Sequence, residues 1–319
     1  MKILITGGLG FIGGNFINYL QKHKNDIDKI YNIDCQTYAS NNLLIKKHKH
    51  LFKNKYAYKN VDISNTKKIN KVLCKLDITH IINFAAETHV DNSISNSDVF
   101  VKTNILGTHN LLQYVVKNPS IRYHQISTDE VFGSLSKEDD KFNENSKYNP
   151  KNPYAATKAA SDLLVKSFIN TFKINAVITN CSNNYGPYQN FEKLIPKTIF
   201  NLLNNKKVPI YSNGSNIRDW IFVEDHCEIL FKILKSDHIG NLCIGGDGEE
   251  SNLQIVEKIC KCLNKQLNEN IEYVKDRPGH DFRYAIDNSK IYNMFKWTPK
   301  TSLEDGINKT INFYKQWKV

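Results

Sequence analysis

The sequence predicts an α/β protein, with a doubly wound parallel sheet over residues 1–180 and a smaller α/β lobe over residues 181–319. Two observations predict this fold class. Short apolar stretches alternate with amphipathic stretches of helical period in the first part of the chain, which is the pattern of repeated βαβ units. The first of these units also carries glycines where its strand turns into its helix. We expect the segment near residues 219–235 to return to the first lobe.

The amino-terminal unit has the parts of a dinucleotide-binding Rossmann motif. The apolar strand of residues 2–6 leads into a glycine-rich turn and a helix over residues 11–23, and a strand over residues 30–33 ends in Asp34. Glycines let backbone amides approach a pyrophosphate, and a carboxylate about 20 residues further on can bond the adenosine ribose. Because a carboxylate would repel a 2′-phosphate, NAD is favoured over NADP. The cofactor residues expected here are Gly7, Gly10, Phe11, Ile12, Gly13, Asp34 and Thr37.

The next units supply further residues for the same cofactor. The strand of residues 56–61 leads to Asp62, which could bond the adenine amino group or could cap a helix that starts near residues 64–65. The strand of residues 80–84 is followed by small residues against which a cofactor can lie, and a helix is expected over residues 99–116. The cofactor residues expected from these units are Asp62, Ile63, Phe84, Ala85, Ala86 and Thr103.

Chemically active side chains gather after the strand of residues 121–126. The run Ser127-Thr128-Asp129-Glu130 presents a hydroxyl and two adjacent carboxylates at the carboxyl edge of the sheet, where open α/β sheets bind ligands. Downstream, Pro153 suits a first helical turn, so Tyr154 and Lys158 share one helical face. Lys158 and a nicotinamide cation would lower the pKa of Tyr154 and make it a proton acceptor. The alternative is a solvated acidic turn beside a core tyrosine.

Composition narrows the class of protein. No run reaches the roughly 18 apolar residues of a membrane span, and the amino terminus goes directly into a strand pattern, so we expect a cytoplasmic protein with no membrane partner. The net charge of +11 comes from dispersed lysines without a nucleic-acid motif, so we expect no nucleic-acid partner. The seven cysteines are scattered without a Cys-x-x-Cys pair, which favours reduced, mostly buried thiols over a metal site.

Motifs spread along nearly the whole chain carry a family resemblance. They are TGGLGFIGG (6–14), FAAETHVDNSI (84–94), TNILGT (103–108), HQISTDEVFGS (124–134), NPYAATKAASD (152–162), NCSNNYGPYQNFEKLIP (180–196), NGSNIRDWIFVEDH (213–226) and DRPGHDFRYAID (276–287). With these motifs the chain resembles the nucleoside-diphosphate-glucose 4,6-dehydratases of the extended short-chain dehydrogenase/reductase family. The Thr-Asp-Glu triplet is the most specific part, because related epimerases and decarboxylases generally lack the adjacent acidic pair.

The resemblance implies a role for each catalytic candidate. Tyr154 would take the proton of the glucose C4 hydroxyl while the C4 hydride passes to NAD, and Lys158 would tune Tyr154 and bond the nicotinamide ribose. Glu130 would remove the C5 proton, Asp129 would protonate the departing C6 hydroxyl, and Thr128 would hold the C4 oxygen. The implied activity is dehydration of dTDP-glucose or UDP-glucose to the 4-keto-6-deoxy sugar nucleotide by a lyase that retains its NAD. Such a step leads to deoxysugars such as rhamnose.

The resemblance also assigns residues of the smaller lobe to substrate binding. Arg218 would contact the diphosphate, with a buried pair to Asp219 as the alternative, and Arg277 has the same two interpretations. Asn252 either contacts the substrate or caps the helix over residues 253–263. The resemblance assigns Asn184 to the cofactor. The expected substrate residues are Glu87, Thr88, Thr128, Asn183, Lys193, Leu194, Pro209, Tyr211, Arg218, Asn252, Arg277 and His280.

Two other classes of function compete with dehydration. One is 4-epimerisation or decarboxylation of a sugar nucleotide on the same fold. The other is a non-catalytic NAD-binding or nucleic-acid-binding protein, against which the complete set of catalytic candidates argues. By family analogy, the helices near residues 99–116 and 154–172 would form the interface of a homodimer. The amphipathic helix over residues 303–317 is expected only to pack.

Overall fold

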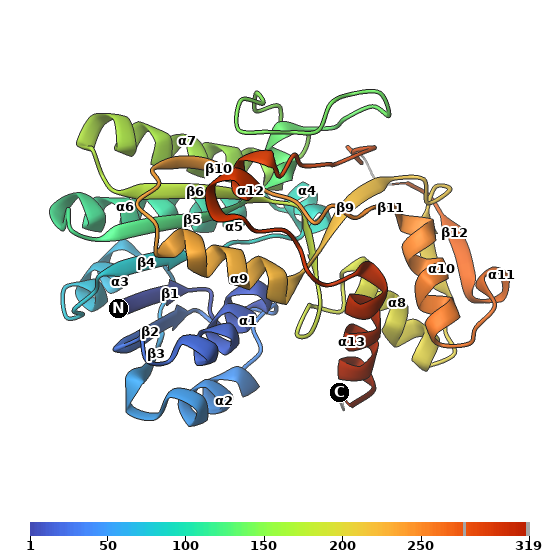
Figure 1. Cartoon of the computed structure of the whole chain (residues 1–319), viewed down its shortest axis with the longest axis horizontal. Coiled ribbons are helices and arrows are strands. Elements are labelled where there is room, and N and C mark those ends of the chain that lie inside the picture. The colour runs from blue at the N-terminus through green and yellow to red at the C-terminus, as the bar shows by residue number, and fades with distance from the viewer. Residues whose placement is uncertain (277–278, 317–319) are drawn as a thin grey trace.

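The computed structural model describes residues 1–276 and 279–316, and its first lobe is built on a seven-stranded sheet (Figure 1). All neighbouring strands of this sheet are parallel. Their order is β10 (Gly240–Ile244), β6 (Ala176–Cys181), β5 (Arg122–Thr128), β4 (His80–Asn83), β1 (Lys2–Thr6), β2 (Lys29–Asp34) and β3 (Tyr56–Asn60). The strand order reverses between β1 and β4, which is where doubly wound sheets bind ligands. The predicted fold class is therefore confirmed.

Helices cover both faces of this sheet because its central strands are apolar on both sides. In β1, Ile3 and Ile5 face one core and Leu4 faces the other. The first face carries α1 (Phe11–Tyr19), which continues as η1 (Leu20–His23), with α2 (Leu43–Phe52), η2 (Lys53–Lys55), α9 (Val223–Leu234) and α12 (Ser289–Phe295). The second face carries α3 (Thr66–Leu73), α6 (Thr108–Lys117) and α7 (Pro153–Phe172).

The smaller lobe lies beside the carboxyl ends of these strands, on the right in Figure 1. It contains the three-stranded sheet β11 (Glu249–Ser251), β9 (Ile217–Phe222) and β7 (Asn183–Tyr185), and the parallel pair β8 (Val208–Tyr211) and β12 (Ile271–Val274). Its helices are α8 (Leu194–Leu203), α10 (Asn252–Cys262), α11 (Leu267–Asn270) and α13 (Leu303–Gln316). Their apolar faces meet in a separate core that includes Ile199, Ile259 and Ile311.

One later segment returns to the first lobe. Helix α9 packs beside α1, and β10 adds the edge strand next to β6. Arg122 at the start of β5 holds the end of α9, because its guanidinium donates to the carbonyls of Ile233 and Leu234 at 3.0 and 3.1 Å. These contacts support the proposed division of the chain near residue 180, with a returning segment that runs on to the end of β10.

The helix predicted over residues 99–116 is divided in the structure. The short helices α4 (Val90–Ser95) and α5 (Asp98–Phe100) lead into a π-helical stretch, η3 (Val101–Gly107), and only then into α6. In η3 the Asn104 amide oxygen accepts from the Glu87 backbone amide at 2.9 Å, and its nitrogen donates to the Glu87 carbonyl at 3.1 Å. The π-helical turn thus holds the Asn104 side chain against the segment that follows β4. Such turns are frequent at functional sites.

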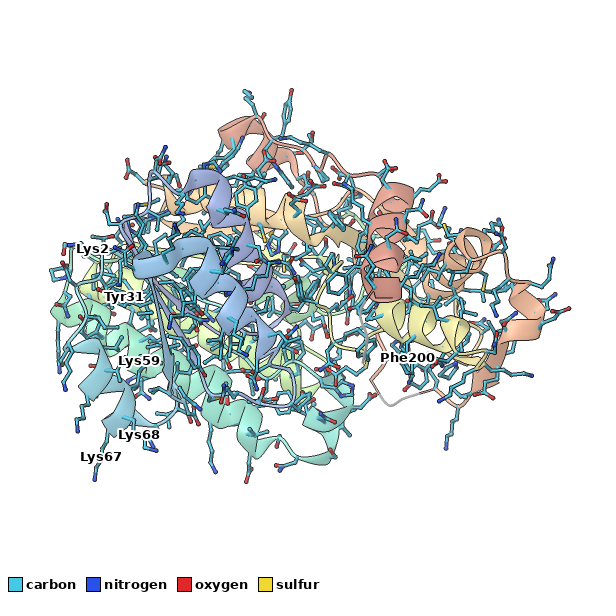
Figure 2. The ribbon with its side chains drawn as sticks, turned by 90° about the horizontal axis from the view of Figure 1, so that it is seen from below. Lys2, Tyr31, Lys59, Lys67, Lys68 and Phe200 are labelled. Atoms are coloured by element: carbon cyan, nitrogen blue, oxygen red, sulfur yellow. The ribbon has the colours of Figure 1, made fainter. Side chains whose placement is uncertain are left out.

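Several of the lysines that give the chain its positive charge lie on solvated faces. Figure 2 shows Lys59, Lys67 and Lys68 directed outward at the end of the molecule away from Phe200 of the smaller lobe. All three are exposed. Across the described residues, no helix combines the length and the apolar composition that crossing a membrane requires.

Candidate active site

The end of β5 places the acidic pair. All seven residues of β5 are buried, as expected for a strand covered on both faces. At Thr128 the chain turns into the 3₁₀ helix η4 (Asp129–Phe132), and the Thr128 hydroxyl accepts a hydrogen bond from the Glu130 amide at 3.3 Å. The turn buries Asp129, which is 1% exposed, and leaves Glu130 half-buried. Two consecutive carboxylates therefore occupy different environments.

The start of α7 places the phenol and the ammonium. The Asn152 side chain caps the helix by accepting from the Ala155 amide at 2.9 Å, and proline occupies the first turn. Tyr154 and Lys158 are consequently one turn apart on a buried face. The Lys158 Nζ atom donates to the Ile126 carbonyl on β5 at 2.6 Å.

Both junctions open into one cavity of about 240 Å³. All five catalytic candidates line it: Thr128, Asp129, Glu130, Tyr154 and Lys158. It is also lined by the cofactor candidates Gly7, Gly10, Phe11, Ile12, Gly13, Phe84, Ala86 and Asn184, and by the substrate candidates Thr88, Asn183 and Lys193. Residues that are far apart in the sequence thus meet at the edge of the sheet where the strand order reverses.

A second cavity of about 80 Å³ adjoins the first and shares Gly7, Gly10 and Phe84 with it. Its predicted residues are Asp34, Thr37, Asp62, Ile63, Ala85, Ala86, Glu87 and Thr103. The Asp34 carboxylate is fixed by the Leu9 amide at 3.0 Å and the Ser40 hydroxyl at 2.8 Å. Together the cavities form an elongated site that begins at the acidic pair and ends at a fixed carboxylate.

The glycine-rich turn fits a dinucleotide. A Cβ atom at Gly7 would lie 2.7 Å from the Ala85 backbone nitrogen, and one at Gly13 would lie 2.4 Å from the Gly7 carbonyl oxygen. Gly7 also has a φ of +69°, which favours glycine. At the start of α1, Gly10 provides no side-chain cap, so the first amides of the helix remain available to a phosphate. The backbone cradle and Asp34 are the features that NAD requires.

Comparison with known proteins identifies the family. The family described as GDP-mannose 4,6-dehydratase matches residues 4–310. This chain belongs to that family. It is 41% identical to the dTDP-glucose 4,6-dehydratase of Haemophilus influenzae, with 98% of both chains covered. It is 40% identical to that of Neisseria meningitidis, with 99% of this chain and 94% of the relative covered.

Solved structures of 4,6-dehydratases share the whole fold. The dTDP-glucose 4,6-dehydratase of Bacillus anthracis in complex with NAD is 40% identical, with a TM-score of 0.90, and 99% of this chain and 97% of that one are covered. The enzyme of Streptomyces venezuelae with NAD and TYD bound is 36% identical, with a TM-score of 0.93 and the same coverage. The family resemblance expected from the motifs is therefore confirmed.

Within this dehydratase fold, Asp129 is in a site that favours its neutral acid. Burial, followed by the charges of Glu130 and Asp219, holds the pKa of Asp129 well above its usual range, and the charge of Arg218 offsets this only in part. Its Oδ1 atom accepts from the Thr128 hydroxyl at 3.3 Å. Its Oδ2 atom has no hydrogen-bond partner in the described part of the chain. A buried protonated carboxyl group beside an anionic one is suited to donating a proton.

The expectation that Lys158 and a nicotinamide cation together make Tyr154 a proton acceptor stays a prediction, because the structure describes the protein without the dinucleotide. Burial, with the nearby charge of Glu130, raises the pKa of Tyr154 well above its usual value, and the hydrogen bond with the Thr128 hydroxyl offsets this only in part. Burial also lowers the pKa of Lys158, whose Nζ atom is directed at the Ile126 carbonyl. The desolvation of the phenol therefore outweighs any help from the ammonium.

Helix caps correct two further interpretations. Helix α3 begins at Thr66, and its cap is Asn65, whose side chain accepts from the Lys68 amide. Asp62 instead accepts from the Ser64 amide at 2.8 Å and lines the second cavity, so the capping role proposed for it is wrong. Similarly, α10 is capped by a Ser251–Gln254 capping box. Asn252 is the first helical residue, so it is not the cap; its substrate contact stays a prediction.

Arg218 lies inside β9. Its guanidinium donates to the carbonyls of Ile217, Asp281 and Phe282 at 2.7, 3.0 and 3.3 Å. Asp219 accepts from the amides of Gly246 and Gly248 instead. The alternative of a buried Arg218–Asp219 pair is therefore wrong, because backbone groups hold both side chains. The diphosphate contact expected of Arg218 stays a prediction.

The other substrate candidates of the smaller lobe lie outside the two cavities. They are Leu194 at the start of α8, Pro209 and Tyr211 on β8, and His280, whose ring meets that of Tyr211 edge-on with a centroid distance of 6.0 Å. Arg277 lies outside the described residues. The roles of all these residues stay predictions.

The loop after β7 contributes residues that the sequence did not single out. Gln189, Asn190 and Glu192 line the larger cavity. The loop is held to the first lobe because the Asn15 side chain donates to the Pro187 carbonyl at 2.8 Å. Its polar, turn-rich composition predicts a site loop, but which side chains face the cavity depends on the positive φ values of Gly186 and Tyr188.

Proposed function

We propose that the protein is an NAD-dependent hydro-lyase that converts dTDP-glucose to its 4-keto-6-deoxy derivative. The single observation that carries this proposal is the cavity in which Thr128, Asp129, Glu130, Tyr154 and Lys158 meet beside the dinucleotide cradle. Dehydration of a hexose needs a proton acceptor at C4, a base at C5 and an acid at C6. The relatives named dTDP-glucose 4,6-dehydratase favour dTDP over UDP as the nucleotide.

Asp129 would act as the acid. Its raised pKa keeps a proton on the carboxyl group, and the cavity gives that proton access to a C6 hydroxyl. Glu130 faces the same cavity and would take the C5 proton. When Glu130 takes the C5 proton it becomes neutral, and the negative charge passes to the sugar, next to the C6 hydroxyl that Asp129 protonates as it leaves.

Thr128 and Tyr154 would hold the C4 oxygen, with Tyr154 as the proton acceptor. NAD, when bound, would supply a hydride acceptor for C4 oxidation and the hydride that returns to C6. Burial raises the pKa of Tyr154, so the protein without bound NAD favours the protonated phenol. We infer that proton acceptance by Tyr154 requires the cofactor-loaded site. Asp34 would hold the adenosine ribose of the dinucleotide, and the amides of the Gly7–Gly13 turn would hold its pyrophosphate.

We also propose a homodimer that works in the cytoplasm, in a route to deoxysugars such as rhamnose. Exposed apolar residues gather on helices that pack together: Val99 on α5, Val101 and Leu106 on η3, and Leu163 on α7, which are 39%, 47%, 40% and 55% exposed. Apolar side chains exposed on adjoining helices are typical of an interface between chains.

The test uses the purified protein without added NAD. Incubation with dTDP-glucose should give a product lighter by one water, with a 4-keto group and a 6-deoxy carbon, as determined by mass spectrometry and NMR. UDP-glucose should react more slowly. An isomer of the substrate would indicate 4-epimerisation and would contradict the proposal, and so would salt-sensitive binding of random nucleic acid without any turnover.

A further inference from the structure

Helix α7 carries a second buried charge, Asp162, one turn after Lys158. The Asp162 side chain is completely buried. Its Oδ2 atom accepts from the Ser127 hydroxyl at 2.6 Å, the Asn180 amide at 3.1 Å and the Tyr148 hydroxyl at 3.2 Å. Its Oδ1 atom has no hydrogen-bond partner among residues 1–276 and 279–316. A carboxylate this deep, with one oxygen unpartnered, needs a compensating positive charge nearby.

The donors to Asp162 belong to the strand ends that hold the catalytic groups. Ser127 directly precedes Thr128 at the end of β5. The Asn180 amide that bonds Asp162 also donates to the Thr128 carbonyl at 3.2 Å. Asp162 therefore joins α7 to the ends of β5 and β6, directly behind the cavity wall.

Lys158 is the buried ammonium one helical turn before this carboxylate on α7. Its Nζ atom donates to the Ile126 carbonyl, and in the described ranges no ion pair within 4.0 Å joins it to Asp162. Burial lowers the pKa of Lys158, and the charge of Asp162 counteracts that effect. Burial raises the pKa of Asp162, and the charge of Lys158 counteracts that. Charges in a low-dielectric interior interact without direct contact, so each stabilises the other.

We propose that Asp162 is a positioning residue that keeps Lys158 charged and held against the catalytic cavity. The inference deepens the proposed function and rests on it only for its kinetic test. The competing explanation is that Asp162 is only a hydrogen-bond acceptor that fastens β5, β6 and the Tyr148 loop together. The two explanations differ in whether the loss of Asp162 acts through Lys158.

Other titratable groups face this pair and would contribute to a pH profile. Burial raises the pKa of the neighbouring phenols and of the neighbouring thiol. The other nearby ammonium is half-buried, and burial lowers its pKa. These groups are Tyr123 on β5, Tyr148 before α7, Tyr154 and Lys166 on α7, and Cys181 on β6.

A double-mutant cycle in thermal unfolding tests the proposal without any catalysis. Asp162→Asn keeps an acceptor for Ser127 and Tyr148 but leaves the Lys158 ammonium buried and unpaired, so the Tm should fall. Adding Lys158→Met removes that ammonium, so the double variant should melt above Asp162→Asn alone. If the double variant melts no higher than Asp162→Asn, or if removing the ammonium does not restore folding to an Asp162→Asn variant that fails to fold, the loss of Asp162 does not act through Lys158 and the proposal is overturned.

Asp225→Asn provides the matched control. Asp225 is another buried carboxylate, on α9, and it accepts from the backbone amides of Lys300 and Thr301 at 3.1 and 2.8 Å. When Asp225→Asn is combined with Lys158→Met, the decrease in Tm should equal the sum of the decreases in the two single variants. Recovery of the Tm in the control pair as well would mean that Lys158→Met is stabilising in any background, and it would overturn the assignment to Asp162.

The kinetic test follows the alkaline limb of the pH profile for C4 oxidation in a single turnover. In Asp162→Asn the limb should move to lower pH by about one unit, because the neutral form of Lys158 is favoured when its counter-charge is gone. Lys166→Met, which removes the other nearby ammonium, should leave the limb in place. An unmoved limb in Asp162→Asn overturns the proposal. If no sugar nucleotide is dehydrated, the proposed function fails, while the unfolding cycle still decides the coupling.

Discussion

Gly13→Ala tests how the dinucleotide cradle is built. A Cβ atom at Gly13 would lie 2.4 Å from the Gly7 carbonyl oxygen, whereas ordinary contacts lie at 3.4–4 Å, so the turn and α1 would have to separate by about 1 Å. The obstacle is backbone and cannot rotate away. Overpacking of this kind costs about 1–3 kcal/mol, and the gain in helix propensity from alanine offsets about 1 kcal/mol of that loss. We expect a lower Tm and at least about tenfold weaker NAD binding, or about 1.4 kcal/mol.

Gly14→Ala is the matched control, because it makes the same substitution at the next position of α1. Its Cβ atom would lie 2.5 Å from Leu44 Cδ1, which is the flexible end of a side chain. Leu44 can move, so this variant should bind NAD within about twofold of the parent, or ~0.4 kcal/mol. Two measurements follow NAD binding. The first is the amount of NAD that heat releases from the purified proteins, and the second is equilibrium dialysis of the proteins after their NAD has been removed. If Gly13→Ala binds NAD as well as Gly14→Ala does, the close approach is not what forms the cradle.

Three further substitutions separate the roles of the charged groups. Glu130→Gln should still oxidise C4, seen as near-ultraviolet absorbance of reduced nicotinamide, but should lose water roughly 10²–10⁴-fold more slowly because the C5 base is gone. Asp129→Asn should show a similar loss of dehydration. Its Tm relative to the parent should rise with pH: the folded pKa of Asp129 is raised, so its contribution to stability is full at low pH and is lost as pH rises through that pKa. Arg122→Lys should lower the free energy of unfolding by about 2–3 kcal/mol, measured in urea, because a lysine cannot make the guanidinium's bonds to the end of α9.

The controls for these variants are also in the chain. Glu138→Gln changes an exposed glutamate outside both cavities and should dehydrate at the parental rate. Parental rates of water loss in Glu130→Gln would exclude Glu130 as the C5 base. A Tm difference for Asp129→Asn that falls with pH would contradict the neutral state assigned to Asp129. Unchanged stability of Arg122→Lys would mean that its bonds to α9 contribute little.

The site elements that the sequence predicts best are those made from adjacent residues. The strand, glycine turn and helix of residues 2–19 are one continuous stretch, and Asp34 follows at the end of the next strand, so their spacing alone places them at one edge of the sheet. The same holds for the acidic pair, because a strand that ends at Thr128 delivers the next two residues to that edge. Pro153 and a capping asparagine likewise mark the start of α7 within one residue.

The parts that the sequence does not predict depend on contacts between distant segments. The Leu135 amide donates to the Arg283 carbonyl at 3.0 Å, and the Phe142 amide donates to the Ala285 carbonyl at 2.9 Å. These contacts are isolated β-bridges rather than strands, so neither an alternating hydrophobic pattern nor a helix cap in the sequence predicts them. The hydrogen-bond partners of Arg218 could not be predicted for the same reason, because they include carbonyls of residues more than 60 positions away. Its isolated motif predicts a diphosphate contact, with a salt bridge to its neighbour as the alternative, and only the fold reveals the backbone acceptors.

The junction of β5 and η4 also explains how two neighbouring carboxyl groups can hold different roles. The turn that caps the Glu130 amide with the Thr128 hydroxyl sends Asp129 inward and leaves Glu130 at the cavity. Burial disfavours the charged form of Asp129, and the adjacent charge of Glu130 disfavours it further, so both effects raise the pKa of Asp129. An acid and a base are thereby produced from one turn of backbone, and the charge of Asp219 adds to the effect. It follows that a change at Thr128 that loosens the turn should reduce this difference between the two acids, even though Thr128 itself carries no charge.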